Sequence, residues 1–474
     1  MNKILRNLVY QGFFQLITIG APVVILYVAS TALGPSGLGL YTYIISIAQY
    51  FVLFAGLGLQ TYGIREIARC RDNRQNLSRT FWELEICSVL PSSLAFLAFL
   101  ILALFMGNES FYLISSLVVL AALFDISWFF SGVEDFRAIT IASGGLKILT
   151  VLATFVLVHT PADLSIYFWI QSLSALLGQV VLWCFLVGRV SLVLPSLRDS
   201  FRHLRNAIRF FLLKISISLY TILLRVLLGI LVSVSAVAIF ANAYALASVA
   251  IGVIGVVDTV LLPRLSHMYS AGKEDEMKRI TERVIHLQLY LTLPLCCGIG
   301  LVSSKVVPWF MGHGFEQVIT VAPVLSLVVI IVPLGVTIAR QLLIPIDRIR
   351  ESNISLAAGA VVGVGIGLTL IPIMQVWGAV IAALAAESTV TGIRLILLRK
   401  LSSFHIDWSF LIRVAMCTVL MGAVVFFTTH ALNASPMTAL FQVLLGIAVY
   451  ISTTILLHAC PLVPLLQNWR SSKG

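Results

Sequence analysis

Two basic side chains fall inside a long apolar stretch, residues 207–231, where the composition predicts a helix within a membrane. Lys214 and Arg225 are separated by about three full helical turns, so they share one helical face and lie roughly 16 Å apart along the axis. A charge inside a bilayer costs about 2.5–3.5 kcal/mol on insertion scales, which makes buried cations candidate functional groups. Two stacked cations suit a ligand that carries negative charge and moves along the bilayer normal. We therefore predict that Arg225 and Lys214 bind substrate.

Three acidic side chains fall inside other apolar stretches, and each is a candidate either for ion coupling or for a structural charge. They are Asp125 in residues 111–133, Asp258 in 235–262 and Glu387 in 377–398. Lys214 lies at about the depth of Asp258 on the next predicted span, so an ion pair between them is the structural alternative for Lys214. Arg225 has no acidic residue opposite it on that predicted hairpin, which favours a functional role.

Patterns of enzymatic chemistry are absent from the sequence. The chain contains no H-E-x-x-H, no G-x-S-x-G and no G-x-x-x-x-G-K-[ST]. Its 8 His residues are scattered, and its 7 Cys residues show neither metal-ligand nor exported-disulfide spacing. We therefore expect no catalytic residues, no metal, no cofactor and no transport driven by ATP bound to this chain. The chain is not expected to be an enzyme.

The elements that hold these residues are predicted to be membrane helices. Hydrophobic residues make up 59% of the chain and charged residues 11%, and the mean hydropathy is +1.03. These values and the long apolar stretches predict an all-α, polytopic membrane protein with about 14 transmembrane helices.

Positive charge alternates between the connections of these predicted helices. Nearly all Lys and Arg residues fall in every second connection, and Lys305 is the exception. Because cytoplasmic loops retain positive residues, this alternation predicts that both termini are cytoplasmic. The formal charge of +11 is explained by the same bias, so nucleic acid is not an expected partner.

An internal repeat predicts two lobes. A shift of 199 residues places Arg6 on Arg205 and Arg65 on Arg264, and each half then contains six spans in the same orientation. Between the halves, apolar residues from Leu197 to Ile208 recur at helical spacing beside a stripe of Arg residues, which predicts an amphipathic helix on the inner leaflet. The expected organisation is an N-terminal lobe over 1–195, a C-terminal lobe over 196–400 that begins with this linker helix, and two additional spans with a cytoplasmic tail over 401–474.

Three stretches carry a resemblance to one family. They are LGPSGLGLYTYIISIAQYF with the following YGIREIA, then DISWFFSGVEDF, and then LLPRLSHMYSAG. Together they resemble the Wzx-type flippases of O-antigen or capsule repeat units. These belong to the multidrug/oligosaccharidyl-lipid/polysaccharide (MOP) superfamily, with the lipid II flippases and the MATE exporters. The resemblance covers about Asn7 to about Lys400. The matched motif residues are Gly34, Gly37, Tyr41, Arg65, Glu66, Asp125, Trp128, Gly132, Glu134, Pro263 and Arg264, and the family pattern assigns none of them a settled chemical role.

The resemblance implies two six-helix lobes around a central cavity, often with two additional C-terminal helices. It implies a bacterial inner-membrane protein that moves undecaprenyl-diphosphate-linked oligosaccharides from the cytoplasmic to the outer leaflet, by alternating access through a cationic central cavity. The partners that it implies are this substrate and the lipid bilayer, with a polysaccharide polymerase and chain-length proteins as further candidates. The physics agrees, because a diphosphate with sugars cannot cross hydrocarbon unless charged and polar groups replace its water.

Other functions remain open on the sequence alone. An ion-coupled small-molecule exporter of the MATE type would be expected to depend on buried carboxylates, which are few here, and would not explain the DISWFFSGVEDF segment. A membrane polysaccharide polymerase generally needs a large outer loop with charged catalytic residues, but the predicted outer connections contain only four formal charges: Glu109, Asp163, Lys305 and Glu316. The buried cations argue against a purely structural protein. The aromatic residues of the DISWFFSGVEDF segment also allow a simpler interpretation, an interfacial aromatic belt.

Overall fold

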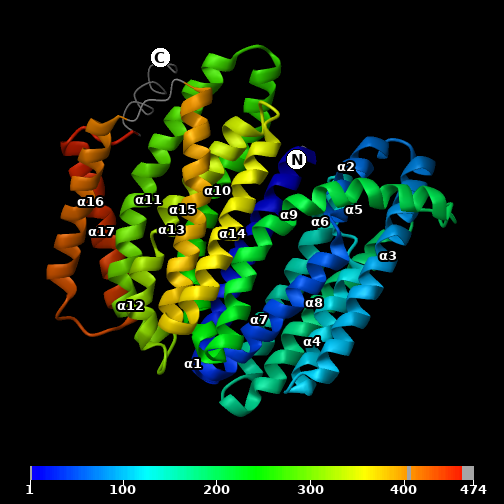
Figure 1. Cartoon of the computed structure of the whole chain (residues 1–474), viewed down its shortest axis with the longest axis horizontal. Coiled ribbons are helices and arrows are strands. Elements are labelled where there is room, and N and C mark those ends of the chain that lie inside the picture. Colours follow the sequence, from blue (N-terminus) through cyan, green and yellow to red (C-terminus); the bar gives the residue numbers. More distant parts are fainter. Residues whose placement is uncertain (1–2, 403–406, 462–474) are drawn as a thin grey trace. The chain divides into compact units, whose positions relative to one another are not determined.

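All regular elements in the described part of the chain are helices (Figure 1). The computed structural model describes residues 3–402 and 407–461. Twelve helices in this part are long and apolar enough to cross a membrane, which confirms the predicted all-α polytopic membrane protein. One of the 12, Gly20–Cys70, contains two predicted spans, and part of the predicted span over 207–231 has no described side chains. The count of about 14 therefore stays a prediction.

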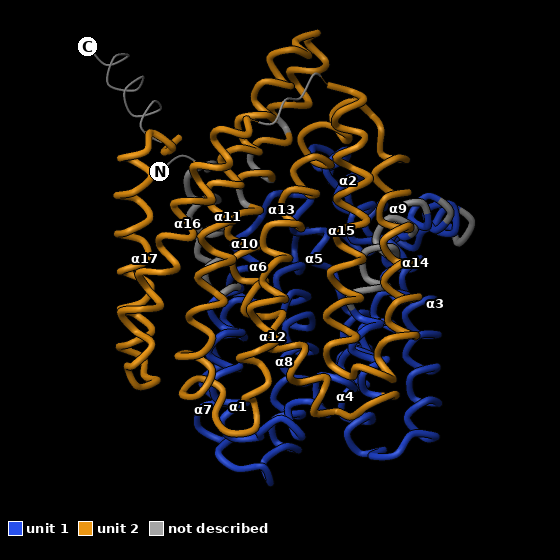
Figure 2. Tube along the Cα trace, turned by 60° about the vertical axis from the view of Figure 1, so that its left-hand side comes forward, with its two compact units in different colours: residues 1–229 blue, residues 230–474 orange. Residues whose placement is uncertain are grey.

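The chain divides into two compact units, Met1–Gly229 and Ile230–Gly474, which Figure 2 distinguishes by colour. Unit 1 thus includes most of the helix that the repeat assigns to the start of the C-terminal lobe. The lobe boundaries drawn from the repeat stay a prediction. The elements of unit 1 are α1 (Lys3–Gly56), α2 (Leu59–Cys70), α3 (Arg74–Phe105), α4 (Glu109–Ala121), η1 (Ala122–Phe124), α5 (Ser127–Gly132), α6 (Phe136–Ile139), η2 (Thr140–Gly144), α7 (Gly145–Leu157), η3 (Pro161–Asp163), α8 (Leu164–Leu186) and α9 (Leu197–Leu231).

A sharp kink divides α1 into two arms. Gly34 has φ 65° and ψ −177°, a backbone conformation that glycine adopts without the steric cost that a Cβ would bring. Pro35 follows, and it lacks the N–H that a continuous helix would use while also excluding helical geometry at the preceding residue. The kink lies in the Leu-Gly-Pro-Ser-Gly stretch, residues 33–37.

Two apolar cores lie among the described residues of unit 1. One contains Ile44, Phe99 and Phe168 from α1, α3 and α8, all completely buried. The other contains Phe81 of α3 and Trp128 of α5, among residues from α2 to α9. Where membrane helices pack against one another, such contacts stabilise mainly through van der Waals attraction, because the surrounding lipid is itself apolar. The two cores fix α1 to α9 as one packed body.

Unit 2 contains the remaining helices and a second set of cores. Its elements are α10 (Val234–Ser270), α11 (Glu274–Phe310), α12 (Glu316–Leu325), α13 (Val328–Ile338), η4 (Ala339–Leu343), α14 (Ile349–Met374), α15 (Val376–Leu401), α16 (Trp408–Thr429) and α17 (Pro436–Leu456). One core joins Leu265 of α10, Ile285 of α11 and Leu342 of η4. Both η2 and η4 are π-helical turns, which insert one residue into a helix and re-aim the side chains there.

Small residues let α14 and α15 pack backbone against backbone. A Cβ at Gly378 would lie 2.5 Å from the carbonyl carbon of Leu370, and one at Gly359 would lie 2.9 Å from the carbonyl oxygen of Ala386. Such distances are shorter than van der Waals contact, so only glycine fits at both positions. This agrees with the general use of small residues where membrane helices pack closely.

The C-terminal pair, α16 and α17, packs against α11. Tyr450 donates a 2.6 Å hydrogen bond to the Tyr290 carbonyl, and the Tyr290 hydroxyl lies 3.1 Å from Thr454 Oγ1. The sulfur of Cys297 lies 2.8 Å from the place that a Cβ on Gly422 would occupy. The two helices, Trp408–Thr429 and Pro436–Leu456, lie in the region 401–474, where two additional spans were predicted.

Candidate functional site

The DISWFFSGVEDF segment interrupts the helix predicted over 111–133. α4 ends at Ala121, and after η1 the backbone of Asp125 is extended, with φ −74° and ψ 99°. The Oδ1 atom of Asp125 accepts a 2.9 Å hydrogen bond from the Ser127 N–H, and its carbonyl accepts one of 2.8 Å from the Trp128 indole. Asp125 thus forms an Asx turn that starts α5. A role for Asp125 in ion coupling stays a prediction.

The aromatic residues of this segment are buried. Trp128, Phe129 and Phe130 are exposed by 3%, 1% and 0% of their surface. The ring of Trp128 stacks on that of Phe81, with centroids 5.5 Å apart and planes inclined by 25°. The interpretation of these residues as an interfacial belt is therefore wrong, because a belt would place their rings at the membrane surface.

Two glycines allow α2 to approach α5. A Cβ on Gly63 would lie 2.8 Å from Cε3 of Trp128, and one on Gly132 would lie 2.6 Å from Cγ2 of Ile67. Each glycine thus lies against a bulky side chain of the other helix. A glycine on one helix and a large apolar residue on the other are both needed for this close contact. Gly132 of the family motif acts through packing in this structure.

Charged pairs close the rim of the α2–α5 contact. Arg71 Nη1 lies 2.7 Å from Glu134 Oε1, and Arg189 pairs with Asp135 while its guanidinium lies 5.4 Å from the centre of the Phe130 ring. The hydrogen bond that Arg71 donates to the Glu134 carboxylate raises the pKa of the exposed Arg71 above its ordinary value. Glu134 has φ 59°, so its backbone also makes the turn that ends the segment.

Some of the remaining motif residues pack between helices, and others lie at the surface. Gly37 follows the α1 kink, and the Tyr41 ring contacts Tyr167 and Phe168 with centroids 4.7 and 5.1 Å apart. On α2, Glu66 forms an ion pair of 3.1 Å with Arg69. Two other motif residues, Arg65 and Arg264, are exposed, and the side chain of Pro263 lies outside the described residues.

A buried polar chain attaches the start of α9 to α2 and α3. The His203 imidazole lies between Tyr62, whose hydroxyl is 2.8 Å from Nδ1, and Glu83, whose Oε2 is 3.0 Å from Nε2. Glu83 also accepts a 2.8 Å bond from Arg79, which pairs with Asp199 at 3.0 Å. Figure 1 shows the first turns of α9 crossing the end of unit 1 where α2 and α5 lie. The amphipathic linker predicted from Leu197 is therefore the first part of one continuous helix rather than a separate element.

The two predicted substrate-binding cations both lie on α9. Arg225 is half-buried, and one turn later Gly229 receives the ring of Tyr43, so α9 packs closely on α1 there. The backbone of Lys214 belongs to α9, and its side chain lies outside the described residues. Substrate binding by Arg225 and Lys214, and the alternative ion pair of Lys214 with Asp258, stay predictions.

In unit 2, Asp258 is completely buried and lies among neutral hydrogen-bond partners. Its Oδ1 atom is 2.8 Å from Thr337 Oγ1 and 2.7 Å from Gln341 Nε2, and its Oδ2 atom is 3.2 Å from Gln288 Nε2. These partners belong to α13, η4 and α11. This cluster has no local sequence signal, because its members are 30 to 83 positions from Asp258.

Sequence reasoning missed three other buried charges. Arg394 of α15 is buried and donates 3.0 Å bonds to the Gly335 carbonyl and to Ser355 Oγ. Glu83 and Glu85 of α3 are also buried, and Glu85 Oε2 has no hydrogen-bond partner among the described residues. All three fall inside predicted spans, so the rule that selected Glu387, which is also buried, would have found them.

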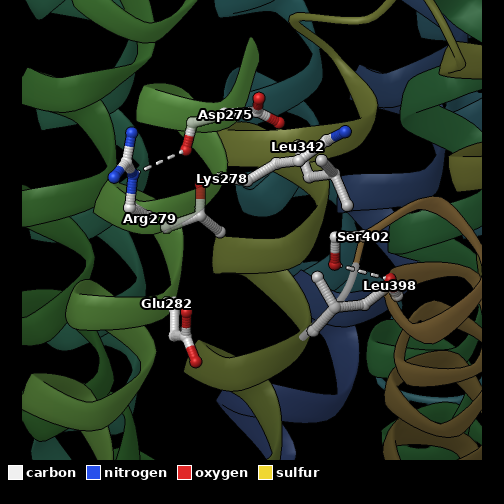
Figure 3. A pocket seen from close by; sticks show the side chains of 8 residues that line it. Asp275, Lys278, Arg279, Glu282, Leu342, Leu398 and Ser402 are labelled. Carbon is white, nitrogen blue, oxygen red and sulfur yellow. Dashed lines mark hydrogen bonds between the residues drawn. The ribbon is translucent and has the colours of Figure 1, made fainter. Parts of the chain in front are cut away.

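Two hollows lie within unit 2. One of about 220 Å³ is lined by residues of α11, η4 and α15, and in Figure 3 Arg279 and Ser402 bond the carbonyls of Asp275 and Leu398. Both bonds are local, each to a carbonyl four residues earlier, so neither crosses the hollow. The other hollow has about 470 Å³ and an almost wholly apolar lining from α11, α16 and α17, with Gly298 and Gly446 on its walls. It can hold a hydrocarbon chain.

The fold and the helix composition define a polytopic membrane protein with the fold of the MOP transporters. Two solved structures share this fold. The lipid II flippase MurJ in an inward closed conformation has a TM-score of 0.76 at 13% identity, with 95% of this chain and 98% of that chain covered. An inward-facing multidrug resistance MATE family transporter of the MOP superfamily has a TM-score of 0.67 at 14% identity, with 83% and 97% covered.

The family itself is shown by sequence. The family model described as "Polysaccharide biosynthesis protein" matches residues 4–269, and the chain belongs to this family. A curated relative from Escherichia coli (strain K12), named "Putative O-antigen transporter", is 23% identical over 404 residues, which are 83% of this chain and 96% of the relative. These findings confirm the resemblance to Wzx-type flippases of the MOP superfamily that the sequence motifs indicate.

Proposed function

We propose that this protein moves undecaprenyl-diphosphate-linked oligosaccharides from the cytoplasmic to the outer leaflet of the bacterial inner membrane, for the synthesis of a cell-surface polysaccharide. The observation that carries the proposal is the family match over residues 4–269, together with a relative named as an O-antigen transporter along nearly its whole length. The many membrane helices and the fold shared with transporters support it. Both termini are proposed to be cytoplasmic, from the charge of the connections.

The proposed mechanism is alternating access through a cationic central cavity. A diphosphate cannot enter hydrocarbon without replacement of its water, and a guanidinium replaces that water well because it forms two parallel hydrogen bonds to phosphate oxygens. Arg225 is the described cation that we assign to this contact, and Lys214, on the same face of α9, is the second. Polysaccharide polymerase and chain-length proteins are proposed to receive the product.

The polyprenyl tail of such a substrate needs an apolar path beside the protein. The hollow between α11, α16 and α17 supports this part of the proposal, because its lining is almost wholly apolar and it holds about 470 Å³. An isoprenoid chain in this hollow would keep the substrate bound to the protein while its diphosphate and sugars cross the membrane.

Deletion of the gene tests the function. We expect loss of the surface polysaccharide and accumulation of the lipid-linked unit on the inner leaflet. Single units on the outer leaflet of the deletion strain would instead indicate a polymerase. An unchanged surface polysaccharide, with loss of resistance to small toxic compounds, would indicate an exporter of the MATE type.

Substitution of Arg225 tests the mechanism. Arg225→Ala is expected to abolish or sharply reduce export at normal protein abundance, and Arg225→Lys is expected to retain part of it, because charge survives without the two-pronged geometry. The matched control is Arg283→Ala, at an exposed position of α11, which should leave export unchanged. Full export by a normally expressed Arg225→Ala variant would show that this cation does not contact the substrate.

A further inference from the structure

The buried carboxyl of Asp258 is part of a closed hydrogen-bonded ring in unit 2. Its three members are Asp258, Thr337 and Gln288. Thr337 Oγ1 lies 2.8 Å from Asp258 Oδ1 and 2.6 Å from Gln288 Oε1, and Gln288 Nε2 lies 3.2 Å from Asp258 Oδ2. All three side chains are buried by at least 98% of their surface. Every contact in the ring therefore has to be made by the hydrogens that the three groups themselves carry.

A count of these hydrogens gives one too few for an ionised carboxyl. Three contacts close the ring, and each needs one hydrogen between its two heavy atoms. The Thr337 hydroxyl supplies one and the Gln288 amide supplies one toward Asp258. An ionised Asp258 supplies none, so the Thr337 oxygen would face either the Asp258 or the Gln288 oxygen with no hydrogen between them.

The orientation of the Gln288 amide does not change this count. If its nitrogen and oxygen are exchanged, the amide donates to Thr337 and the Thr337 hydroxyl donates to Asp258 Oδ1. The amide oxygen of Gln288 then faces Asp258 Oδ2, and that contact lacks a hydrogen instead. A proton on Asp258 supplies the missing hydrogen in both orientations.

Some groups around the ring favour the ionised form of Asp258, and others favour its neutral form. Gln341, which the π-helical turn η4 aims at the same carboxyl, donates a 2.7 Å bond to Oδ1 and is itself neutral. The positive charge of Arg340, the neighbouring residue in η4, favours the ionised form. Other titratable side chains on the helices packed against α10 include His286 and Tyr290 of α11 and Glu387 and Arg394 of α15. A buried acid inside a membrane costs several kcal/mol when ionised, and Arg340 opposes only part of that cost.

We propose that Asp258 is a proton-binding site of unit 2, which holds its proton while the ring with Thr337 and Gln288 is closed and releases it to water when the ring opens. In the release step the O–H bond of the carboxyl breaks, the electron pair remains on the carboxylate, and the proton passes to water. The carboxylate keeps the Gln341 donor and gains the Thr337 hydroxyl. The use of this proton to couple transport rests on the proposed function, whereas the proton itself does not.

Infrared difference spectroscopy on the purified full-length protein tests the protonation directly. We expect the wild type at neutral pH to show the carbonyl stretch of a protonated carboxyl that shifts in deuterated buffer, and Asp258→Asn to lack it. The matched control is Asp163→Asn, which changes the same residue type at an exposed turn and should keep the band. Thr337→Val should shift the band in either orientation of the Gln288 amide, because the acid then loses its hydrogen bond with the Thr337 hydroxyl.

Thermal unfolding shows whether Asp258→Asn still folds normally. An Asn amide whose oxygen faces Thr337 and Gln341 and whose nitrogen faces the Gln288 oxygen makes every contact of the protonated acid, so Asp258→Asn should leave the unfolding midpoint unchanged. Absence of the protonated band, or a band that disappears when sodium is added at constant pH, would overturn the proposal, the second result in favour of a bound cation.

The role in transport is measured separately. In cells or vesicles that export polysaccharide, Asp258→Asn should export at a rate that no longer responds to an imposed proton gradient, whereas the Asp163→Asn control should respond like the wild type. A normal response of Asp258→Asn would overturn the coupling role and leave the infrared result standing. Failure of the wild type to export at all would count against the proposed function and not against the proton site.

Discussion

The contact between Gly63 and Trp128 supports a prediction that can be worked out from distances. We consider Gly63→Ala, the smallest change that places an atom between α2 and α5. The new Cβ would lie 2.8 Å from Cε3 and 3.0 Å from Cδ2 of Trp128. These are ring atoms, and the ring is held by the indole bond to the Asp125 carbonyl and by stacking on Phe81. The neighbour therefore cannot move aside cheaply.

The sign of the effect follows from two opposing magnitudes. Alanine in place of a helical glycine gains about 1 kcal/mol through helix propensity. Overpacking of a filled core costs about 1–3 kcal/mol. We therefore expect Gly63→Ala to lose up to about 2 kcal/mol of stability, although alanine is the better helix former.

Thermal unfolding of the detergent-solubilised protein, followed by loss of the monodisperse peak in size-exclusion chromatography, measures this loss. The control is Gly145→Ala on α7, where a Cβ meets nothing within 4 Å, and its midpoint should stay equal or rise. The double variant Gly63→Ala with Trp128→Leu should lose less stability than the sum of the losses of the two single variants, because the smaller leucine side chain leaves room for the new Cβ. A Gly63→Ala midpoint at or above that of Gly145→Ala would refute the reasoning.

Three further predictions use the same protein. Arg394→Ala should lower the unfolding midpoint, since it leaves a buried carbonyl without its donor at a cost of roughly 1–3 kcal/mol, and Arg394→Lys should recover only part of it. Gly298→Phe should fill the apolar hollow and reduce export at normal abundance, whereas Gly365→Phe, at another helical glycine with open space, should not. In a cysteine-free background, a cysteine at Ser36 should react with an impermeant thiol reagent added to whole cells and one at Asn76 should not, and the reverse pattern would contradict the predicted orientation.

Hydropathy was sufficient to predict the class of fold. Apolar stretches of about 20 residues have few structural solutions in a bilayer, so their helical character follows from the need to satisfy every backbone group. The Gly34–Pro35 kink was also predictable, because both residues disfavour a continuous helix by their own covalent geometry. Local chemistry decides these features, and the sequence contains all of it.

The course of the chain near Asp125 was not predictable in the same way. An uninterrupted apolar run from 111 to 133 indicates one span, whereas the structure breaks it into α4, a 3-10 turn and α5. Trp128 was open to two interpretations, since buried aromatics and interfacial aromatics have the same composition. What decides between them is the packing of Trp128 on Gly63 and of Ile67 on Gly132, and these contacts are visible only in three dimensions.

The sequence can indicate which charged residues are buried, but it cannot indicate their hydrogen-bond partners. Arg394 lies inside a predicted span, so its burial could have been predicted, but its partners are a carbonyl and serine hydroxyls that form no recognisable ionic pattern. For Asp258 the sequence suggests Lys214 as a partner, and this pair stays a prediction because the Lys214 side chain lies outside the described residues. The described partners are neutral groups from three other elements, which no periodicity of α10 could indicate.

The glycine seam between α14 and α15 has a consequence for biogenesis. Only Gln375, with φ 52°, separates Met374 from Val376, so the two helices are joined by a single residue and touch along their backbones. The connection between the two helices is too short for one helix to enter the membrane without the other. We therefore expect the pair to leave the insertion machinery as one preformed hairpin, and a larger side chain at Gly378 to be recognised by quality-control proteases before unit 2 is complete.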